Sequence, residues 1–330
     1  MKATSISVVV PNYQGEEVLE ACLRALLSQS RTVDQIVVVD DGSTDGSVEI
    51  LRRYASKVRT VLLPRNVGFA AAANAGIRES RSDITLLLNN DTEPSPKWAD
   101  EMVKLLELLG ERSIVRGLII NQGQTREDAM QFETLDVLGR GRRVRSARRP
   151  DPFVASGCSV GFWTSAVGEP FEERYEMYNE DTLLSWASRL RGWAVAMSPE
   201  AVVRHLGGHA SKRLGERPSY LCERNRLLNL LILYESKTLV RLAPLILADL
   251  GIHMAKTPLY ARSYAWVLLH FRWVLQKRRT IQAERAIPDS QVLSIMSCRV
   301  LPEERSGVAR SVGSVVRHYL KAFGIRTIDG

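Results

Sequence analysis

The sequence contains few cysteines and no long apolar run. Its four cysteines lie far apart and form no C-x-x-C pair, so a disulfide framework or a zinc knuckle is not expected, and a reducing cytosol suits the chain. No stretch reaches about 18 uninterrupted apolar residues, so a membrane-spanning helix is not supported. The first residues lack the long apolar core and small-residue cleavage site of a signal peptide.

Acidic residues are outnumbered by basic ones. The chain has 45 Lys and Arg against 37 Asp and Glu, a net charge of +8, which favours nucleic acid, anionic lipid or phosphorylated small molecules as partners. No nucleic-acid-binding module is recognisable and few aromatics accompany the basic run, so we expect no nucleic-acid partner. No G-x-G-x-x-G follows the first strand, which argues against a dinucleotide dehydrogenase.

Strand-like and helix-like segments alternate over the first 110 residues. Short β-branched or aliphatic runs begin at Ile6, Gln35, Val58 and Asp83. Segments with helical spacing follow at 16–28, 43–54 (with Ser43 or Thr44 as N-cap), 69–80 and 96–109. This alternation predicts an α/β fold with a mostly parallel sheet flanked by helices.

The pattern weakens after Gly110, and from about Arg226 the chain becomes helical and more apolar. We therefore predict two domains, an α/β domain over residues 1–225 and a helical region over 226–330. The length suits one large α/β domain with a helical appendage.

Polar residues follow three of the predicted strands, at Pro11-Asn12, Asp40-Asp41 and Asn89-Asn90-Asp91. Ligands in such sheets bind beyond the carboxyl ends of the strands, so we expect these residues to converge on one crevice. The Asp40-Asp41 carboxylates can accept hydrogen bonds from a pyrimidine N–H or a ribose hydroxyl. The alternative is an Asx-turn that caps the next helix.

A divalent cation could be held near Asp91, since Mg²⁺ and Mn²⁺ favour carboxylate and phosphate oxygens. The alternative for Asp91 is ordinary turn chemistry. His205 and His209 follow a strand-like run, and a neutral imidazole can add a metal ligand. A loop histidine can equally be solvated.

Two further clusters open predicted helices. Glu180 and Asp181 supply either a general base or charge that favours a helix N-terminus. Arg224 and Arg226, on either side of Asn225, offer guanidinium groups suited to a diphosphate, or the three residues form a solvated first turn.

Together these segments resemble the family 2 glycosyltransferases, in particular the rhamnosyltransferase-like branch, over about residues 5–230. The resembling pieces, in family order, are SVVVPNYQGEE, VVDDGSTDGS, NVGFAAAANAGI, LLLNNDTEP, YNEDTLLSWASRLRGW, AVVRHLGG and ERNRLL. The resemblance implies a GT-A fold with a C-terminal helical extension. It also implies an inverting, metal-dependent enzyme that moves a sugar from a nucleoside diphosphate to an acceptor hydroxyl. Rhamnose as that sugar rests on the branch alone.

The resemblance also implies residue roles. Asp181 would be the catalytic base, with Glu180 beside it, and Asp91 and His205 would hold Mg²⁺ or Mn²⁺. Donor-binding roles fall on Pro11, Asn12, Asp40, Asp41, Asn66, Gly68, Asn74, Asn90, Arg224 and Asn225.

Three positions depart from the family pattern. Asn89 replaces the first acid of the D-x-D metal motif, so metal binding rests on one carboxylate. Leu183 and Ala187 replace an Asp and an Arg of the helix after the base. These changes leave a non-catalytic nucleotide-sugar-binding scaffold as the alternative function.

The resemblance implies a glycan or a polyprenyl-linked molecule as the acceptor. It also implies a cytoplasmic protein bound at the cytoplasmic face of the inner or plasma membrane. The apolar C-terminal helices beside Lys277, Arg278 and Arg279, and the arginine-rich stretch 140–149, suit contact with a membrane surface. The alternatives are a helical hairpin packed on the catalytic domain and a solvated loop. The oligomeric state is not indicated.

Overall fold

The computed structural model describes residues 4–144, 151–207, 215–301 and 307–329. The chain forms two compact units, which are described separately. The first comprises Met1–Met130, Ala155–Leu184 and Trp193–Pro218, and the second comprises Gln131–Val154, Ser185–Gly192 and Ser219–Gly330. The predicted functional boundary between residues 225 and 226 stays a prediction.

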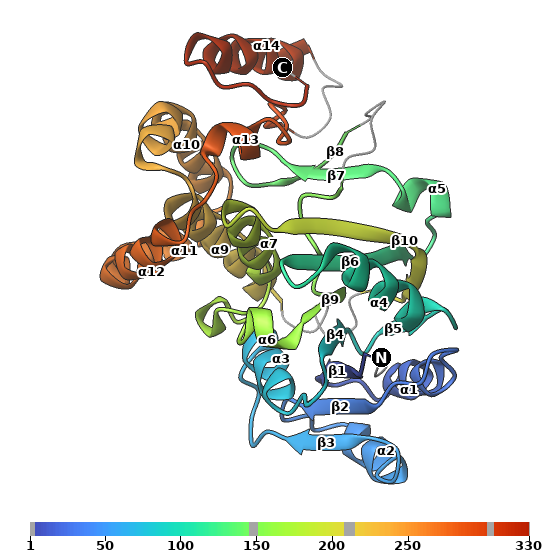
Figure 1. The fold of residues 1–330 in the computed structure, drawn as a ribbon. Helices are drawn as coiled ribbons and strands as arrows, with labels where there is room; N and C mark the ends of the chain where they lie inside the picture. Colours follow the sequence, from blue (N-terminus) through green and yellow to red (C-terminus); the bar gives the residue numbers. More distant parts are fainter. Residues whose placement is uncertain (1–3, 145–150, 208–214, 302–306, 330) are drawn as a thin grey trace. The chain divides into compact units, whose positions relative to one another are not determined.

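The first unit is built on an eight-stranded sheet (Figure 1). Its strands are β1 (Ile6–Asn12), β2 (Gln35–Asp40), β3 (Arg59–Leu62), β4 (Ile84–Leu88), β5 (Thr92–Pro94), β6 (Ser113–Asn121), β9 (Ser159–Trp163) and β10 (Ala194–His205). They lie in the order β3-β2-β1-β4-β9-β6-β10-β5. Six of them run in one direction, and only β9 and β5 pair antiparallel to their neighbours. The predicted mostly parallel α/β fold is confirmed.

Helices cover both faces of this sheet. The helical elements are α1 (Leu19–Leu27), α2 (Ser47–Arg53), α3 (Phe69–Arg78), α4 (Trp98–Leu109), α5 (Arg126–Ala129), α6 (Thr164–Val167), the 3-10 turn η1 (Glu173–Tyr175) and α7 (Glu180–Leu190). Side chains alternate along β1: Val8 and Val10 pack in a core with α1, α2 and α4, while Val9 packs in a second core with α3. The continuous apolar runs of the sequence therefore mark strands buried on both faces.

Close packing explains why α3 is rich in alanine. A Cβ at Gly76 would lie 2.3 Å from Cγ1 of Val9 and 2.9 Å from Cγ2 of Val39, so this helix lies directly on the sheet.

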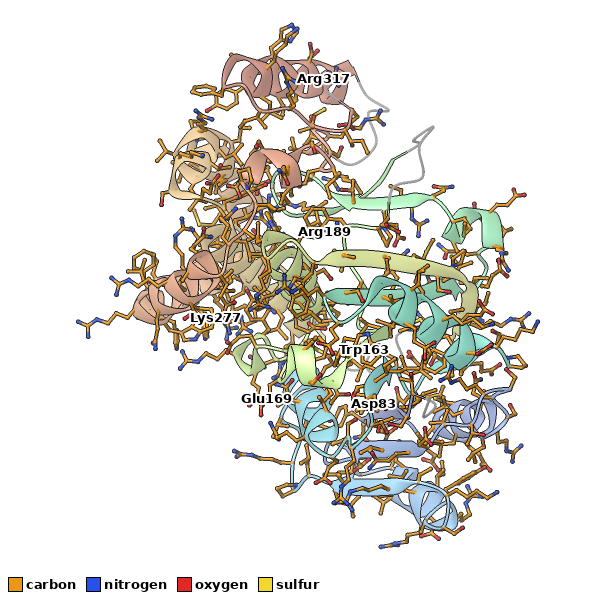
Figure 2. The ribbon with its side chains drawn as sticks, in the orientation of Figure 1. Asp83, Trp163, Glu169, Arg189, Lys277 and Arg317 are labelled. Carbon is orange, nitrogen blue, oxygen red and sulfur yellow. The ribbon has the colours of Figure 1, made fainter. Side chains whose placement is uncertain are left out.

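Asp83, labelled in Figure 2, comes just before β4. Its carboxylate accepts hydrogen bonds from the backbone N–H and the hydroxyl of Ser5, at 2.9 and 2.7 Å. This contact ties the start of β4 to the start of β1.

The predicted N-cap of the second helix is wrong. The helix α2 begins at Ser47 with Gly46 as N-cap, and no side chain caps it. The Ser43 hydroxyl instead accepts a hydrogen bond from the backbone N–H of Gln14, at 2.9 Å. The Ser43 hydroxyl therefore connects the loop after β1 to the loop after β2 and does not cap the start of a helix.

The second unit contains a β-hairpin and a set of helices, as the predicted helical extension requires. Its elements are β7 (Phe132–Leu135), β8 (Gly141–Val144), α9 (Arg217–Leu233), α10 (Ser236–Lys256), α11 (Leu259–Leu269), α12 (Phe271–Ala283), α13 (Asp289–Leu293) and α14 (Gly307–Ala322). Its core includes Trp186, whose ring meets those of Phe153 and Tyr234 edge-on at centroid distances of 5.5 and 4.8 Å.

The arginine-rich stretch is not a free surface loop over its first part. Residues Gly141–Val144 form β8, Arg142 makes a 2.6 Å ion pair with the buried Asp136, and Arg140 makes a 2.9 Å ion pair with Asp249. Burial raises the pKa of Asp136 to about 6, although the charge of Arg142 opposes the rise. Arg142 is held by the buried Asp136 and Arg140 by the partly buried Asp249, so neither is available to meet lipid. Residues 145–150 lie outside the described part of the chain.

One helical stretch among the described residues, Ser236–Ala255 in α10, is long and apolar enough to cross a membrane. Length and composition alone are weak grounds for a span, because core helices of soluble proteins satisfy them too. Its hydropathy is high only as an average, because polar residues interrupt the stretch, and no long uninterrupted apolar run therefore marks it in the sequence. Pro244 lies inside α10.

Candidate functional site

The carboxyl ends of β1 and β2 bring the first predicted donor-binding residues together. Asn12 ends β1 directly opposite Asp40, which ends β2. The Asn12 amide donates to Asp40 Oδ1 at 2.8 Å, and the backbone N–H of Ser43 donates to Asp40 Oδ2 at 3.0 Å. The bond from Ser43 closes the Asx-type turn that was the alternative interpretation, and it also fixes the Asp40 carboxylate at the strand end. Pro11 is buried within β1 and pairs with Val39.

The second acid, Asp41, holds the loop that leads into α3. Its carboxylate accepts hydrogen bonds from the backbone N–H groups of Val67 and Gly68, at 2.7 and 3.0 Å. Burial raises the Asp41 pKa, and these two bonds oppose the rise. Asp41 therefore fixes the position of the loop at Val67 and Gly68. Asn66, in the same loop, is exposed.

The loop after β4 joins this cluster through Asn90. The Asn90 amide donates to Asn12 Oδ1 at 2.7 Å, so Asn12 links Asn90 to Asp40. A Cβ at Gly15 would lie 2.1 Å from Asn12 Oδ1 and 2.4 Å from Asn90 Nδ2. Only glycine at position 15 leaves room for this bridge, a requirement that the sequence pattern did not reveal.

Asp91 and His205 lie side by side, as predicted. β5 pairs antiparallel with β10, so that His205 faces Thr92, and the imidazole Nε2 lies 3.3 Å from Asp91 Oδ2. The other ring nitrogen, Nδ1, lies 2.8 Å from Asn121 Oδ1. His209 lies outside the described residues.

This donor set fits a divalent cation that also binds phosphate oxygens. No group of three His, Cys, Asp or Glu side chains suited to a metal occurs within the described part of the chain. One carboxylate and one imidazole are nevertheless compatible with Mg²⁺ or Mn²⁺, because such ions are often held by one or two side chains together with substrate phosphates.

In the acid pair at the start of α7, Glu180 is buried and Asp181 is partly buried. The Asp181 carboxylate accepts hydrogen bonds from the backbone N–H groups of Gly157 and Thr182, at 3.1 and 2.7 Å. Glu180 Oε2 is buried without a hydrogen-bond partner among the described residues. Burial raises the pKa of both acids, and the neighbouring Asp181 raises that of Glu180 further, whereas backbone N–H groups oppose the rise at Asp181. The environment therefore favours the negative charge of the pair on Asp181 over Glu180.

The loop before α7 is conformationally strained. Glu176, Tyr178 and Asn179 have φ values of 62°, 68° and 62°, in the left-handed region where a non-glycine residue costs on the order of 1–3 kcal/mol. The loop is held by the Glu176 carbonyl, which accepts from the backbone of Ala70 at 2.9 Å. The N-terminus of α3 thereby fixes where α7 begins, and with it the position of the two acids.

Cys158, to which the sequence pattern gives no role, lies near both Asp91 and Asp181. Its carbonyl accepts from the backbone N–H of Asn89 at 3.1 Å, and its neighbour Gly157 donates to Asp181. Burial raises the pKa of the Cys158 thiol, and the charges of Asp91 and Asp181 both raise it further. Because β9 runs antiparallel to β4, its first residue lies at the same edge as the carboxyl ends of the parallel strands. Asp40, Asp91 and Asp181 thus gather at one edge of the sheet.

The remaining predicted residues are placed differently. The Asn74 amide is paired in both directions with the backbone of Phe171, at 2.8 and 3.2 Å, so its side chain orders that segment. Arg224 and Asn225 belong to the second unit, where both are buried and Arg224 Nε donates to Asn225 Oδ1 at 3.0 Å. The Arg224 guanidinium also lies over the Trp266 ring, 4.5 Å from its centroid. Donor-binding roles for these three residues stay predictions.

Both departures on α7 are buried apolar side chains. Leu183 and Ala187 are 4% and 6% exposed. They pack in the interior, so the positions carry no polar group that faces solvent or a ligand. The departures change packing in α7 and leave Asp181 in place.

The fold and the clustered polar edge define a GT-A-type α/β domain, and solved structures share this fold. The crystal structure of GalNAc-T7 with UDP, GalNAc and Mn²⁺ superposes with a TM-score of 0.61 at 16% identity, over 72% of this chain and 50% of that one. The S. aureus TarS 1–349 structure in complex with UDP-GlcNAc gives a TM-score of 0.53 at 15% identity, over 96% of this chain and 88% of the other.

Residues 7–167 match the family model described as Glycosyl transferase family 2. TuaG of Bacillus subtilis (strain 168), named as a teichuronic acid biosynthesis glycosyltransferase, is 32% identical over 112 residues, 33% of this chain and 43% of TuaG. An undecaprenyl-phosphate 4-deoxy-4-formamido-L-arabinose transferase of Pseudomonas syringae pv. syringae (strain B728a) is 35% identical over 109 residues, 31% of this chain and 32% of the relative. The chain thus matches less than half the length of these relatives.

Proposed function

We propose that this protein is an inverting, divalent-cation-dependent glycosyltransferase that moves a sugar from a nucleoside-diphosphate donor to an acceptor hydroxyl. The observation that carries the proposal is the connected polar edge of the first unit. Asp40, Asn12 and Asn90 are joined by hydrogen bonds at 2.8 and 2.7 Å, and Cys158 lies within the electrostatic influence of both Asp91 and Asp181. Three acids from distant parts of the chain therefore face one region.

The residues divide the reaction between them. Asp40 and Asn12 would hold the nucleoside, and Asp91 with His205 would hold the cation. A divalent cation bound there would offset negative charge on the leaving diphosphate. Asp181 accepts the proton of the acceptor hydroxyl while the oxygen of that hydroxyl attacks the anomeric carbon from the side opposite the diphosphate. The bond from that carbon to the diphosphate oxygen breaks, and the configuration inverts.

We infer that the acceptor is a glycan or a polyprenyl-linked sugar used in cell-surface polysaccharide or glycolipid assembly, at the cytoplasmic face of the membrane. The names of the relatives support this inference, since one is assigned to teichuronic acid and the other to an undecaprenyl-phosphate acceptor. For the donor, the solved structures with UDP or UDP-GlcNAc favour UDP. The rhamnosyltransferase-like motifs favour dTDP-rhamnose.

A thermal-shift screen against UDP-, dTDP- and GDP-sugars, with Mn²⁺ or with EDTA, tests the proposal. A donor at 100 times its Kd stabilises the folded state by about 2.7 kcal/mol, so the correct donor should raise Tm by several degrees when Mn²⁺ is present. Slow hydrolysis of the same donor should accompany binding. Binding without hydrolysis or transfer would support the scaffold function instead, and no stabilisation by any donor would contradict both.

We also propose that the corner between α11 and α12 contacts an anionic phospholipid surface. Leu268 and Leu269 are 74% and 83% exposed there, and Phe271 is 44% exposed. Arg272 and Arg279 are exposed on α12, so basic groups accompany this apolar corner as an anionic surface requires.

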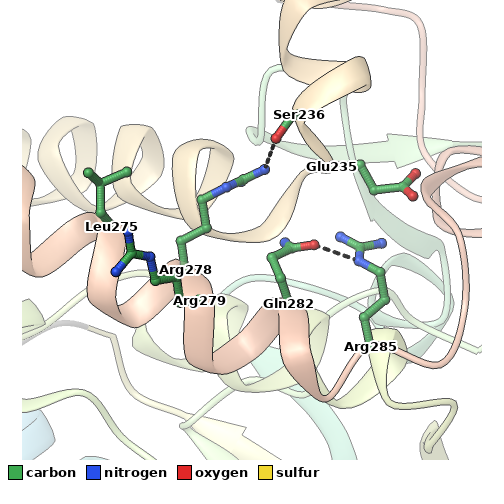
Figure 3. Close-up of a pocket in the computed structure, with 7 residues that line it drawn as sticks. All are labelled: Glu235, Ser236, Leu275, Arg278, Arg279, Gln282 and Arg285. Carbon is green, nitrogen blue, oxygen red and sulfur yellow. Dashed lines mark hydrogen bonds between the residues drawn. The ribbon is translucent and has the colours of Figure 1, made fainter.

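Not every basic residue of this region is available to lipid. A pocket of about 420 Å³ is lined by Arg278, Arg285 and Gln282 together with Glu235, Ser236, Leu275 and Arg279 (Figure 3). Arg278 donates to the carbonyls of Leu231 and Tyr234, and Gln282 donates to those of Ile232 and Leu233. These side chains satisfy the last carbonyls of α9, which have no partner within the helix.

The double substitution Leu268→Ser with Leu269→Ser should weaken binding to vesicles containing anionic phosphatidylglycerol at least about tenfold, because both apolar side chains lose their favourable burial. Co-sedimentation measures this, with Leu108→Ser as the matched control, since Leu108 is 80% exposed on α4 in the other unit. Equal binding of both variants would contradict the contact. Self-association that is lost only in the double variant would identify a second copy as the partner instead.

A further inference from the structure

Asn121 connects the predicted metal ligand His205 to a rigid turn. It is the last residue of β6 and lies directly opposite His205, the last residue of β10. Its Oδ1 lies 2.8 Å from His205 Nδ1, while its Nδ2 donates to Gln124 Oε1 at 2.9 Å. The side chain therefore stands between the histidine and the turn at 121–124.

The hydrogen bonds of this turn fix which way each amide points. The backbone N–H of Asn121 donates to Gln124 Oε1 at 3.2 Å, and a backbone N–H can only donate, so an oxygen must occupy that position of Gln124. An oxygen there requires the NH₂ group of Asn121 to face it. The Asn121 carbonyl oxygen must then face His205, and its partner Nδ1 must carry the hydrogen.

This assignment determines what the other face of the imidazole presents. With the hydrogen on Nδ1, a neutral His205 directs the lone pair of Nε2 towards Asp91 Oδ2, 3.3 Å away. Two electron-pair donors at that distance repel each other unless a proton on Nε2 or a cation lies between them. When a cation takes that place, both atoms already face it as adjacent ligands.

We propose that Asn121, itself oriented by Gln124, is a positioning residue that fixes the tautomer and ring orientation of His205 for metal binding. The inference rests on the proposed metal-dependent transfer and adds the residues that make an imidazole nitrogen, rather than a second carboxylate, the companion of Asp91. An imidazole ligand favours a transition-metal ion over Mg²⁺, so Asn121 also biases the site towards Mn²⁺.

Manganese titration of the full chain, without donor, tests the role of Asn121. Asn121→Leu removes the acceptor and should weaken Mn²⁺ binding about 10- to 100-fold, as loss of an outer partner of a metal-bound histidine typically does. Mg²⁺ binding, measured by competition, should change less. Asn121→Asp keeps an acceptor for Nδ1–H and should restore Mn²⁺ affinity. Gln122→Leu, at the exposed neighbouring position, is the matched control and should bind Mn²⁺ as the unaltered protein does.

A spectroscopic readout separates positioning from a general loss of structure. The electron spin echo of bound Mn²⁺ should show modulation from an imidazole ¹⁴N in the unaltered protein, and this modulation should be lost in His205→Ala and diminished in Asn121→Leu. Unchanged affinity and modulation in Asn121→Leu would overturn the inference, as would the absence of ¹⁴N modulation in the unaltered protein. Either result leaves the proposed transfer standing if donor turnover is observed. Failure of every donor would sink the transfer while the manganese signal still reports on Asn121.

Discussion

Asp181→Asn should lower kcat by about 10²- to 10⁴-fold, the usual contribution of a positioned general base, while donor affinity stays close to that of the unaltered protein. The substitution keeps the volume of the side chain and one of its two oxygens, so it retains the hydrogen bond from either Gly157 or Thr182 and loses the other. It removes the negative charge and the capacity to take the proton of the acceptor. Steady-state transfer with the donor found by thermal shift measures kcat, and thermal shift itself measures donor binding. A variant that retained full turnover would remove Asp181 from this role.

The pH dependence of the same reaction gives an independent check. Burial raises the pKa of Asp181, and only the deprotonated carboxylate can act as the base. The acidic limb of kcat/KM should therefore lie at higher pH than for an ordinary aspartate, with the rate rising as pH increases through the raised pKa. In Asp181→Asn this limb should vanish, leaving a low and flat profile. An acidic limb at the same pH in both proteins would assign it to another group.

Glu180→Gln provides the matched comparison within the acid pair. Burial and the neighbouring Asp181 carboxylate raise the pKa of Glu180 and so favour its neutral form, which an amide of the same size resembles. We expect this substitution to cost much less turnover than Asp181→Asn. A larger loss at Glu180 would transfer the role of base to that residue.

The site was predictable from the sequence where local patterns carry the information. Strands that end in acids are visible as β-branched runs followed by polar residues, and the topology of parallel sheets then places Asn12, Asp40 and Asp91 at one edge. The helix with Glu180 and Asp181 was located by its motif. These features depend on neighbours within a few residues, which a single sequence displays.

The parts that the sequence did not reveal depend on contacts between distant segments. β9 enters the sheet antiparallel between β4 and β6, and only this insertion brings Cys158 beside Asp91 and Asp181. Asn121 faces His205 because β6 pairs with β10 across 84 residues of chain. Arg140 gave no sign of its ion pair because its acidic partner, Asp249, is remote in the sequence. Such pairings leave no periodic signal near either partner.

Asp91→Ala should lower the Mn²⁺-dependent affinity for the donor at least about 100-fold, because it removes the one carboxylate of the proposed metal site and leaves His205 as a single ligand. In thermal-shift experiments the donor should stabilise the unaltered protein with Mn²⁺ and much less with EDTA, whereas Asp91→Ala should show only the small EDTA-like shift under both conditions. Glu93→Gln, an acid two residues further along the chain in β5, is the control and should behave as the unaltered protein.

The stability of the metal-free variant distinguishes a ligand from a structural residue. Asp91 is 7% exposed, and a charge held out of water without a bound cation costs free energy, so its removal relieves that cost in the unliganded protein. We therefore expect the unliganded Asp91→Ala protein to remain folded, with a Tm close to that of the unaltered chain. A folded variant that no longer responds to Mn²⁺ identifies the lost function as cation binding. Donor affinity that is unchanged by EDTA in the unaltered protein would instead show that Asp91 serves the fold, and that transfer proceeds without a metal at this edge of the sheet.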